Sequence, residues 1–101
     1  MQENKHFLYR LIAPRPEFHL KMNDDEAAAM KQHLAYWEIL TEKKNAIVYG
    51  PVFDPGGVWG MAVIEVTTDA AAKDIGDNDP AVASGVCKYE LIPMKIALKR
   101  Q

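Results

Sequence analysis

A glycine- and proline-rich segment at residues 50–60 constrains the fold of this chain more than any other feature. It reads Gly-Pro-Val-Phe-Asp-Pro-Gly-Gly-Val-Trp-Gly and separates two apolar runs, residues 46–49 and 61–66, that are rich in β-branched side chains. Glycine and proline reverse the chain and β-branched runs favour strands, so the pattern predicts an antiparallel hairpin. Chain reversal requires neither an acid nor a large aromatic side chain, so Asp54 and Trp59 are candidate substrate-binding residues. The alternatives are turn formation for Asp54 and core or dimer packing for Trp59.

Two elements are expected before this hairpin. Residues 6–13 are an apolar, aromatic-rich run that predicts a strand ending before Pro14. A helix is predicted over residues 24–44, with Asn23 as its N-cap and Asn45 ending it in the left-handed conformation. Its apolar residues recur at steps of three and four, which is typical of a helix packed on a sheet: Ala27, Met30, Leu34, Trp37 and Leu40.

Three elements are expected after the hairpin. Residues 70–75 predict a short helix, and residues 80–84 a single helical turn for which Asp79 is the cap. Residues 86–97 predict a last strand, in which Pro93 indicates an edge strand or a bulge. The order is therefore βαββαβ in a single domain, an α+β ferredoxin-like fold with a four-stranded antiparallel sheet and both helices on one face.

Helices on one face leave the other face of the predicted sheet uncovered. A chain of 101 residues would expose apolar side chains to water there. Packing two sheets face to face would bury them. We therefore predict a symmetric homodimer that closes into a barrel-like core, with pockets between the sheet and the helices.

Composition excludes several classes of partner. The formal net charge is -2 and the cations are scattered, so the chain lacks the basic surface of a nucleic-acid-binding protein. No apolar run approaches the ~20 residues of a membrane span. The amino terminus is polar and lacks the apolar centre of a secretory signal, so we expect a cytoplasmic protein with a small-molecule ligand and no membrane partner.

Metal and cofactor sites are not expected from the residue pattern. His6, His19 and His33 do not have the spacing of metal ligands. Gly56-Gly57 is too short, and wrongly placed, for a phosphate-binding loop. Cys87 is the single cysteine and lies in a strand-like run, where a buried and inert thiol is the usual occupant.

Several segments, taken in order over residues 7–96, resemble the YCII-related family. They are residues 30–37, Gly50-Pro51-Val52, Asp54-Pro55 with Gly57 and Trp59-Gly60, Asn78-Asp79-Pro80 with Gly85, and Tyr89-Glu90-Leu91 with Pro93. The resemblance implies a dimeric α+β barrel similar to that of muconolactone isomerase. It also implies that a histidine of the first helix and the aspartate of the Asp-Pro step form the active-site pair. These residues are His33 and Asp79 here.

Each member of this pair also has a structural explanation. His33 borders the apolar stripe of its helix, as a core histidine would, and an aspartate before proline is a frequent helix cap. An imidazole beside a carboxylate is nevertheless the arrangement that general acid-base catalysis requires. We expect His33 and Asp79 to lie within hydrogen-bond distance at a pocket wall, with the Tyr36 phenol donating into the same pocket.

Two hypotheses of function follow. The first is a small enzyme without a cofactor that transfers protons on a small organic molecule, as an isomerase, lyase or dehalogenating eliminase. The second is a non-catalytic dimeric module that binds a small metabolite or assists another protein. Met30 favours the second slightly, because many proteins of the resembled family have an arginine at this position.

Overall fold

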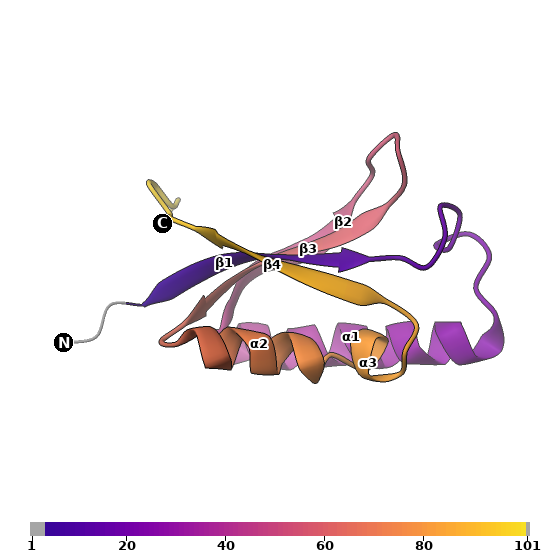
Figure 1. Cartoon of the computed structure of the whole chain (residues 1–101), viewed down its shortest axis with the longest axis horizontal. Coiled ribbons are helices and arrows are strands. Elements are labelled where there is room, and N and C mark those ends of the chain that lie inside the picture. Colours follow the sequence, from indigo (N-terminus) through magenta and orange to yellow (C-terminus); the bar gives the residue numbers. More distant parts are fainter. Residues whose placement is uncertain (1–3, 101) are drawn as a thin grey trace.

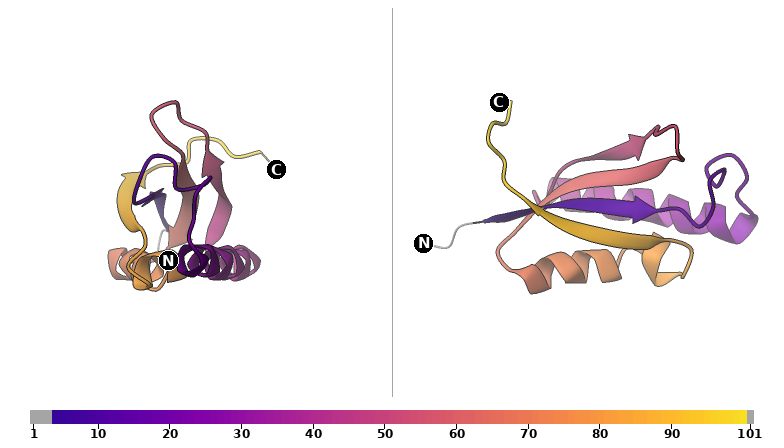
Figure 2. Two further views of the ribbon diagram at one scale, coloured as in Figure 1. Left: turned by 90° about the vertical axis from the view of Figure 1, so that its right-hand side faces the viewer. Right: turned by 45° about the horizontal axis from the view of Figure 1, so that its top comes forward.

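The computed structural model describes residues 4–100 and has two layers, a four-stranded antiparallel sheet and a layer of helices on one of its faces (Figure 1). In chain order the elements are β1 (Lys5–Ile12), α1 (Asp24–Glu42), β2 (Ala46–Val52), β3 (Trp59–Val66), α2 (Asp69–Asp77), α3 (Pro80–Ala83) and β4 (Lys88–Met94). The end-on view in Figure 2 shows α1 and α2 side by side beneath the sheet. The predicted βαββαβ order is confirmed, and the expected helical turn is α3.

The strand order in the sheet is β2-β3-β1-β4, and all three pairings are antiparallel. Pro93 therefore lies in an edge strand, as predicted, where a residue without an N–H is best tolerated. The hairpin strands extend further into the glycine- and proline-rich segment than expected, because Pro51 pairs with Gly60 and Val52 with Trp59. The sheet of a single chain is open, and the predicted barrel would require a second copy.

Helix α1 begins where the sequence predicts and ends two residues early. Asn23 and Glu26 form a reciprocal capping box, with the Asn23 side chain accepting from the Glu26 N–H at 2.8 Å. The left-handed residue after the helix is Lys44, with φ of 69°, so the prediction for Asn45 was wrong. The Asn45 carbonyl instead accepts a bond from the Glu65 N–H at 2.8 Å, because Asn45 immediately precedes β2, which pairs with β3.

The buried side of α1 differs in part from the predicted stripe. Trp37 and Leu40 are buried as expected, but Leu34 is 57% exposed and Ala27 is exposed as well. The helix packs against both α3 and β2, so its buried side is turned toward Ala29, Trp37 and Leu40. The sequence periodicity could not indicate this rotation because α3 follows α1 only after two strands and another helix.

The two faces of the sheet are assigned by strand register. Tyr9 is buried and its ring lies 4.8 Å from that of Trp37 in α1, so it points toward the helices. Its neighbour Arg10 points to the opposite face, together with Met61, with which it is paired in β3. The helix-free face, as this opposite face is called below, is largely apolar: Leu8, Ile12, Val48, Val52, Trp59, Met61, Val63, Ile92 and Met94. In the described residues no helix is long and apolar enough to cross a membrane.

Candidate active site

Asp79 is a fully buried carboxylate at the start of α3. Pro80 occupies the first helical position, where its missing N–H costs nothing, and Asp79 is the N-cap before it. Its Oδ1 atom accepts a hydrogen bond from the Ala81 N–H at 2.9 Å. The predicted cap role is therefore confirmed, and it fixes the carboxylate relative to the backbone.

Three side chains from two other elements also donate to this carboxylate. Asp79 Oδ2 accepts from the Tyr9 hydroxyl of β1 at 2.9 Å and from the Trp37 indole N–H of α1 at 2.8 Å. His33 Nδ1 lies 2.9 Å from Oδ1 and 3.0 Å from Oδ2. The expected hydrogen-bond contact between His33 and Asp79 is confirmed.

The hydrogen bonds decide the charge of the carboxyl group. Burial opposes ionisation of Asp79, but the bonds from His33, Trp37 and the Ala81 N–H outweigh it and hold the pKa of Asp79 below its usual value. Burial, followed by the charge of Asp79, raises the pKa of the Tyr9 phenol. At neutral pH Asp79 is therefore a carboxylate and Tyr9 a neutral donor.

The carboxylate selects one tautomer of His33. Because ionised Asp79 only accepts hydrogen bonds, Nδ1 of His33 carries the proton that faces it. In the neutral ring Nε2 then has a free lone pair, and no protein partner for this atom is found within residues 4–100. The His33 side chain is 12% exposed and lines a cavity.

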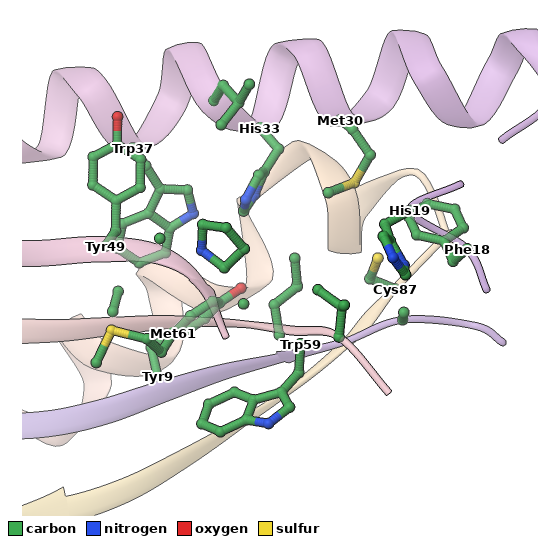
Figure 3. Close-up of a pocket in the computed structure, with 18 of the residues that line it drawn as sticks. Tyr9, Phe18, His19, Met30, His33, Trp37, Tyr49, Trp59, Met61 and Cys87 are labelled. Carbon is green, nitrogen blue, oxygen red and sulfur yellow. The ribbon is translucent and has the colours of Figure 1, made fainter. Parts of the chain in front are cut away.

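This cavity lies between α1, the central part of the sheet and the loop at residues 13–23. Its volume is about 620 Å³, a size that suits a small organic ligand. In Figure 3, Trp37 and Tyr49 lie toward one end, Phe18 and His19 toward the other, and His33 between them. The remaining lining residues are Tyr9, Leu11, Ala13, Met22, Met30, Leu34, Gly50, Pro51, Val58, Trp59, Gly60, Met61, Ala62 and Cys87.

Besides Tyr9 and Trp37, three lining residues with polar or reactive groups were not proposed for the site from the sequence. His19 comes from the loop between β1 and α1, and Tyr49 faces the helices from β2. Cys87 is buried, as expected, and burial raises its pKa to about 11, but its place in the cavity wall was not foreseen. Alternation along β2 could have indicated Tyr49, whereas no local signal indicates His19.

The predicted donation by Tyr36 into the cavity is not found. Its hydroxyl donates instead to the Ile75 carbonyl of α2 at 2.7 Å, and Tyr36 is not among the lining residues. Burial is the main cause that raises the pKa of its phenol to about 12. Tyr36 therefore connects the two long helices, because it lies on the side of α1 that faces α2.

Asp54 and Trp59 are bonded to one another and, in the described residues, not to His33 or Asp79. The Trp59 indole N–H donates to Asp54 Oδ2 at 3.1 Å, and Asp54 Oδ1 accepts from the Gly56 N–H at 2.8 Å, as a turn residue does. The Arg10 guanidinium lies 4.6 Å from the centre of the Trp59 ring, which places the indole on the helix-free face. Trp59 still borders the cavity, whereas Asp54 borders a shallower hollow beside the hairpin tip.

The sequence of the YCII-related domain matches residues 7–95 of this chain. The protein belongs to the YCII-related family. The residues on which the resemblance rests therefore identified the family correctly. No curated protein matches the sequence of this YCII-related protein. In the described part of the chain, no cluster of three or more His, Cys, Asp or Glu residues could hold a metal ion.

Solved structures share the fold of this YCII-related protein. The 5-chloro-2-hydroxyhydroquinone dehydrochlorinase of Burkholderia phenoliruptrix AC1100, in complex with 2,5-dihydroxybenzoquinone, aligns with a TM-score of 0.63 and 21% identity over 90% of this chain and 92% of that one. An uncharacterized Thermotoga maritima protein aligns with a TM-score of 0.54 and 11% identity, over 92% and 100% of the two chains. A Nitrosomonas europaea protein of unknown function aligns with a TM-score of 0.51 and 13% identity, over 100% of this chain and 99% of that one. At these identities the similarity shows the fold.

Proposed function

We propose that this protein is a small enzyme that transfers protons on a small organic molecule without a cofactor, as an isomerase, a lyase or a dehalogenating eliminase. The observation that carries the proposal is the geometry of His33. Its Nδ1 atom is 2.9 Å from a buried carboxylate, and the ring borders a cavity of about 620 Å³. This combination supports a general acid-base role for Nε2.

In the proposed reaction, Nε2 of His33 accepts a proton from a C–H or O–H group of the ligand. The electron pair of a broken C–H bond then forms a double bond. In an isomerisation the imidazolium returns its proton to another atom of the ligand, and in an elimination a leaving group departs with its bonding electrons. Asp79 stabilises the imidazolium and keeps the ring oriented, as the aspartate of a Ser-His-Asp triad does.

Elimination receives separate support from the comparison of structures. One protein of the same fold is named a dehydrochlorinase and was solved with 2,5-dihydroxybenzoquinone. A ring compound of that size is compatible with the cavity beside His33. Of the predicted substrate-binding residues, we propose that only Trp59 forms part of the wall, because Tyr36 and Asp54 do not line the cavity.

Two reactions test the proposal. The wild-type protein is expected to release chloride from 5-chloro-2-hydroxyhydroquinone or to accelerate deuterium exchange from D2O into 2-tetralone. His33→Asn should abolish the activity, since asparagine cannot take up the proton. His6→Asn is the matched control, because His6 is also paired with a carboxylate, Glu65 at 3.0 Å, but does not line the cavity. Wild-type protein inactive in both assays, or equal loss in both variants, would refute the acid-base role.

A non-catalytic binding module is the second candidate. It is favoured by the number of bonds to Asp79, because Tyr9, Trp37 and the Ala81 N–H also donate to it, as expected of a purely structural carboxylate. Such a module would bind ring compounds with affinity similar in the wild type and in His33→Asn, and would show no turnover. Parallel titration and activity measurements on the two proteins distinguish the candidates.

A further inference from the structure

The cavity beside His33 has walls without a permanent charge. None of its lining residues, all of which belong to the described chain, is lysine, arginine, aspartate or glutamate. Burial raises the pKa of the Cys87 thiol to about 11 and, with the nearby Asp79 charge, raises the pKa of the Tyr9 phenol, so both groups are neutral at physiological pH. Among the lining residues only His19 and His33 can become cations.

A fixed negative charge lies directly behind this wall. The Asp79 carboxylate is 2.9 Å from His33 Nδ1 and 2.9 Å from the Tyr9 hydroxyl. Arg15, in the neighbouring loop, is held by both oxygens of Glu26 at 2.8 Å each. An anionic ligand would therefore enter an apolar site with no lysine or arginine to pair with, which is unfavourable.

The shape and surface of the cavity fit a flat, apolar ring. The rings of Phe18, Trp37 and Tyr49 line it, and aromatic side chains favour stacked or edge contacts with another ring. Met30 adds a thioether, which also contacts aromatic rings favourably. Figure 3 shows these side chains around the space that the His33 ring enters from α1.

We propose that the substrate of this site is an uncharged, planar cyclic compound with one acidic proton, such as a phenol or an enolisable ring ketone, and that carboxylates are excluded. The proposal rests on the acid-base function proposed above and names its substrate class. A neutral ground state suits the reaction, because proton transfer to Nε2 of His33 creates the ligand anion and the imidazolium cation together. The developing negative charge is thereby stabilised without a further cation.

Met30 is the position at which this charge preference can be changed. It lies one helical turn before His33 on α1, and both side chains point from the helix toward the strands (Figure 3). Met30→Lys would bring a cation on a flexible side chain to the same wall. Met30→Leu is the matched control, because it keeps the volume and the neutrality of the side chain.

The test uses two ligands of nearly equal shape, neutral 3-hydroxybenzamide and anionic 3-hydroxybenzoate. By isothermal titration at pH 7, the wild type and Met30→Leu are expected to bind the amide at least about tenfold more tightly than the carboxylate. Met30→Lys should tighten binding of the carboxylate, relative to binding of the amide, by about tenfold. The wild-type and Met30→Leu comparisons decide the question even if Met30→Lys fails to fold.

Several results would overturn the proposal. The first is tighter binding of the carboxylate than of the amide by the wild type, and the second is no binding of the amide at about 5 mM. Equal effects of Met30→Lys on both ligands would remove the assigned role of Met30. Failure of the acid-base function alone would give a different result. The wild type would still bind the amide more tightly than the carboxylate, but His33→Asn would not change the rate of proton transfer.

Discussion

At the scale of single residues, the Asp79 carboxylate connects three elements of the fold and is bonded to His33. Asp79 accepts hydrogen bonds from β1, from two positions of α1 and from the backbone of α3. Tyr9 and Trp37 lie 70 and 42 positions from it in the sequence, so no local pattern could predict these two donors. The His33–Asp79 contact was predicted because the resemblance to a known family supplied it, and neither residue alone indicated the other.

Replacing Asp79 by asparagine should destabilise the fold strongly. The cap bond alone accounts for about 1 kcal/mol, but the amide nitrogen cannot accept from Tyr9, Trp37 or His33, so buried donors lose their partner. We expect a loss of roughly 2–4 kcal/mol in the free energy of unfolding, measured in urea. Asp69→Asn is the control: its carboxylate is exposed and, among residues 4–100, forms an ion pair only with Lys5, so the change should stay within roughly 0.5 kcal/mol. Equal losses in the two variants would contradict this account.

The same carboxylate makes stability depend on pH in a definite direction. The folded pKa of Asp79 lies below the ordinary value of 3.8, so its contribution is fully present above that pH and disappears as the pH falls through the lower folded value. The difference in unfolding free energy between the wild type and Asp79→Asn should therefore be constant from about pH 5 to 7 and shrink in stronger acid. Urea titrations across this range measure it. A difference that grows toward low pH would show that Asp79 is protonated in the folded protein.

At the scale of elements, the sequence predicted the features that depend on neighbouring residues and did not predict those that depend on distant contacts. The hairpin at residues 50–60 and the cap at Asn23 depend on neighbouring residues, and both were predicted. The buried side of α1 depends on α3 and β2, so Leu34 was wrongly assigned to the core. His19 reaches the cavity through a loop whose path is set by the burial of Phe18, which composition does not indicate.

Two leucines of α1 provide a matched comparison. Leu40→Ala should lower the free energy of unfolding by about 2–4 kcal/mol, because it leaves a cavity in the core. Leu34→Ala removes the same atoms from a residue that is 57% exposed, so a loss of about 1 kcal/mol or less is expected. Denaturant unfolding of both variants tests which side of α1 is buried. A larger loss for Leu34→Ala would mean that this residue is buried in solution.

At the scale of the whole molecule, the helix-free face is the surface that the proposed homodimer would bury. It displays apolar side chains on all four strands around the paired Arg10 and Glu90, and Arg10 Nε is buried without a hydrogen-bond partner in the described residues. A monomer would leave this surface in water. The predicted homodimer, in which two such faces pack together, remains our proposal for the functional assembly.

Sedimentation equilibrium at micromolar concentration should give twice the chain mass of 11.3 kDa. Ile92→Glu should shift the protein toward the monomer, since Ile92 is 43% exposed on the helix-free face and a buried unpaired charge is costly there. Leu20→Glu is the control, because Leu20 is 73% exposed in the loop before α1. A stable wild-type monomer, or equal dissociation in both variants, would rule out this interface.

If the proposed function holds, the two roles of Asp79, in catalysis and in folding, affect how descendants of such a protein can diverge. A lineage that loses the reaction can discard the histidine, since His33 is only one of four donors to the carboxylate. It cannot discard the aspartate without also losing the cap of α3 and the partner of Tyr9 and Trp37. Among related sequences, selection for folding alone will therefore preserve Asp79. A related sequence that keeps Asp79 is therefore expected to keep the fold. Only one that also keeps His33 is expected to keep the proposed acid-base activity.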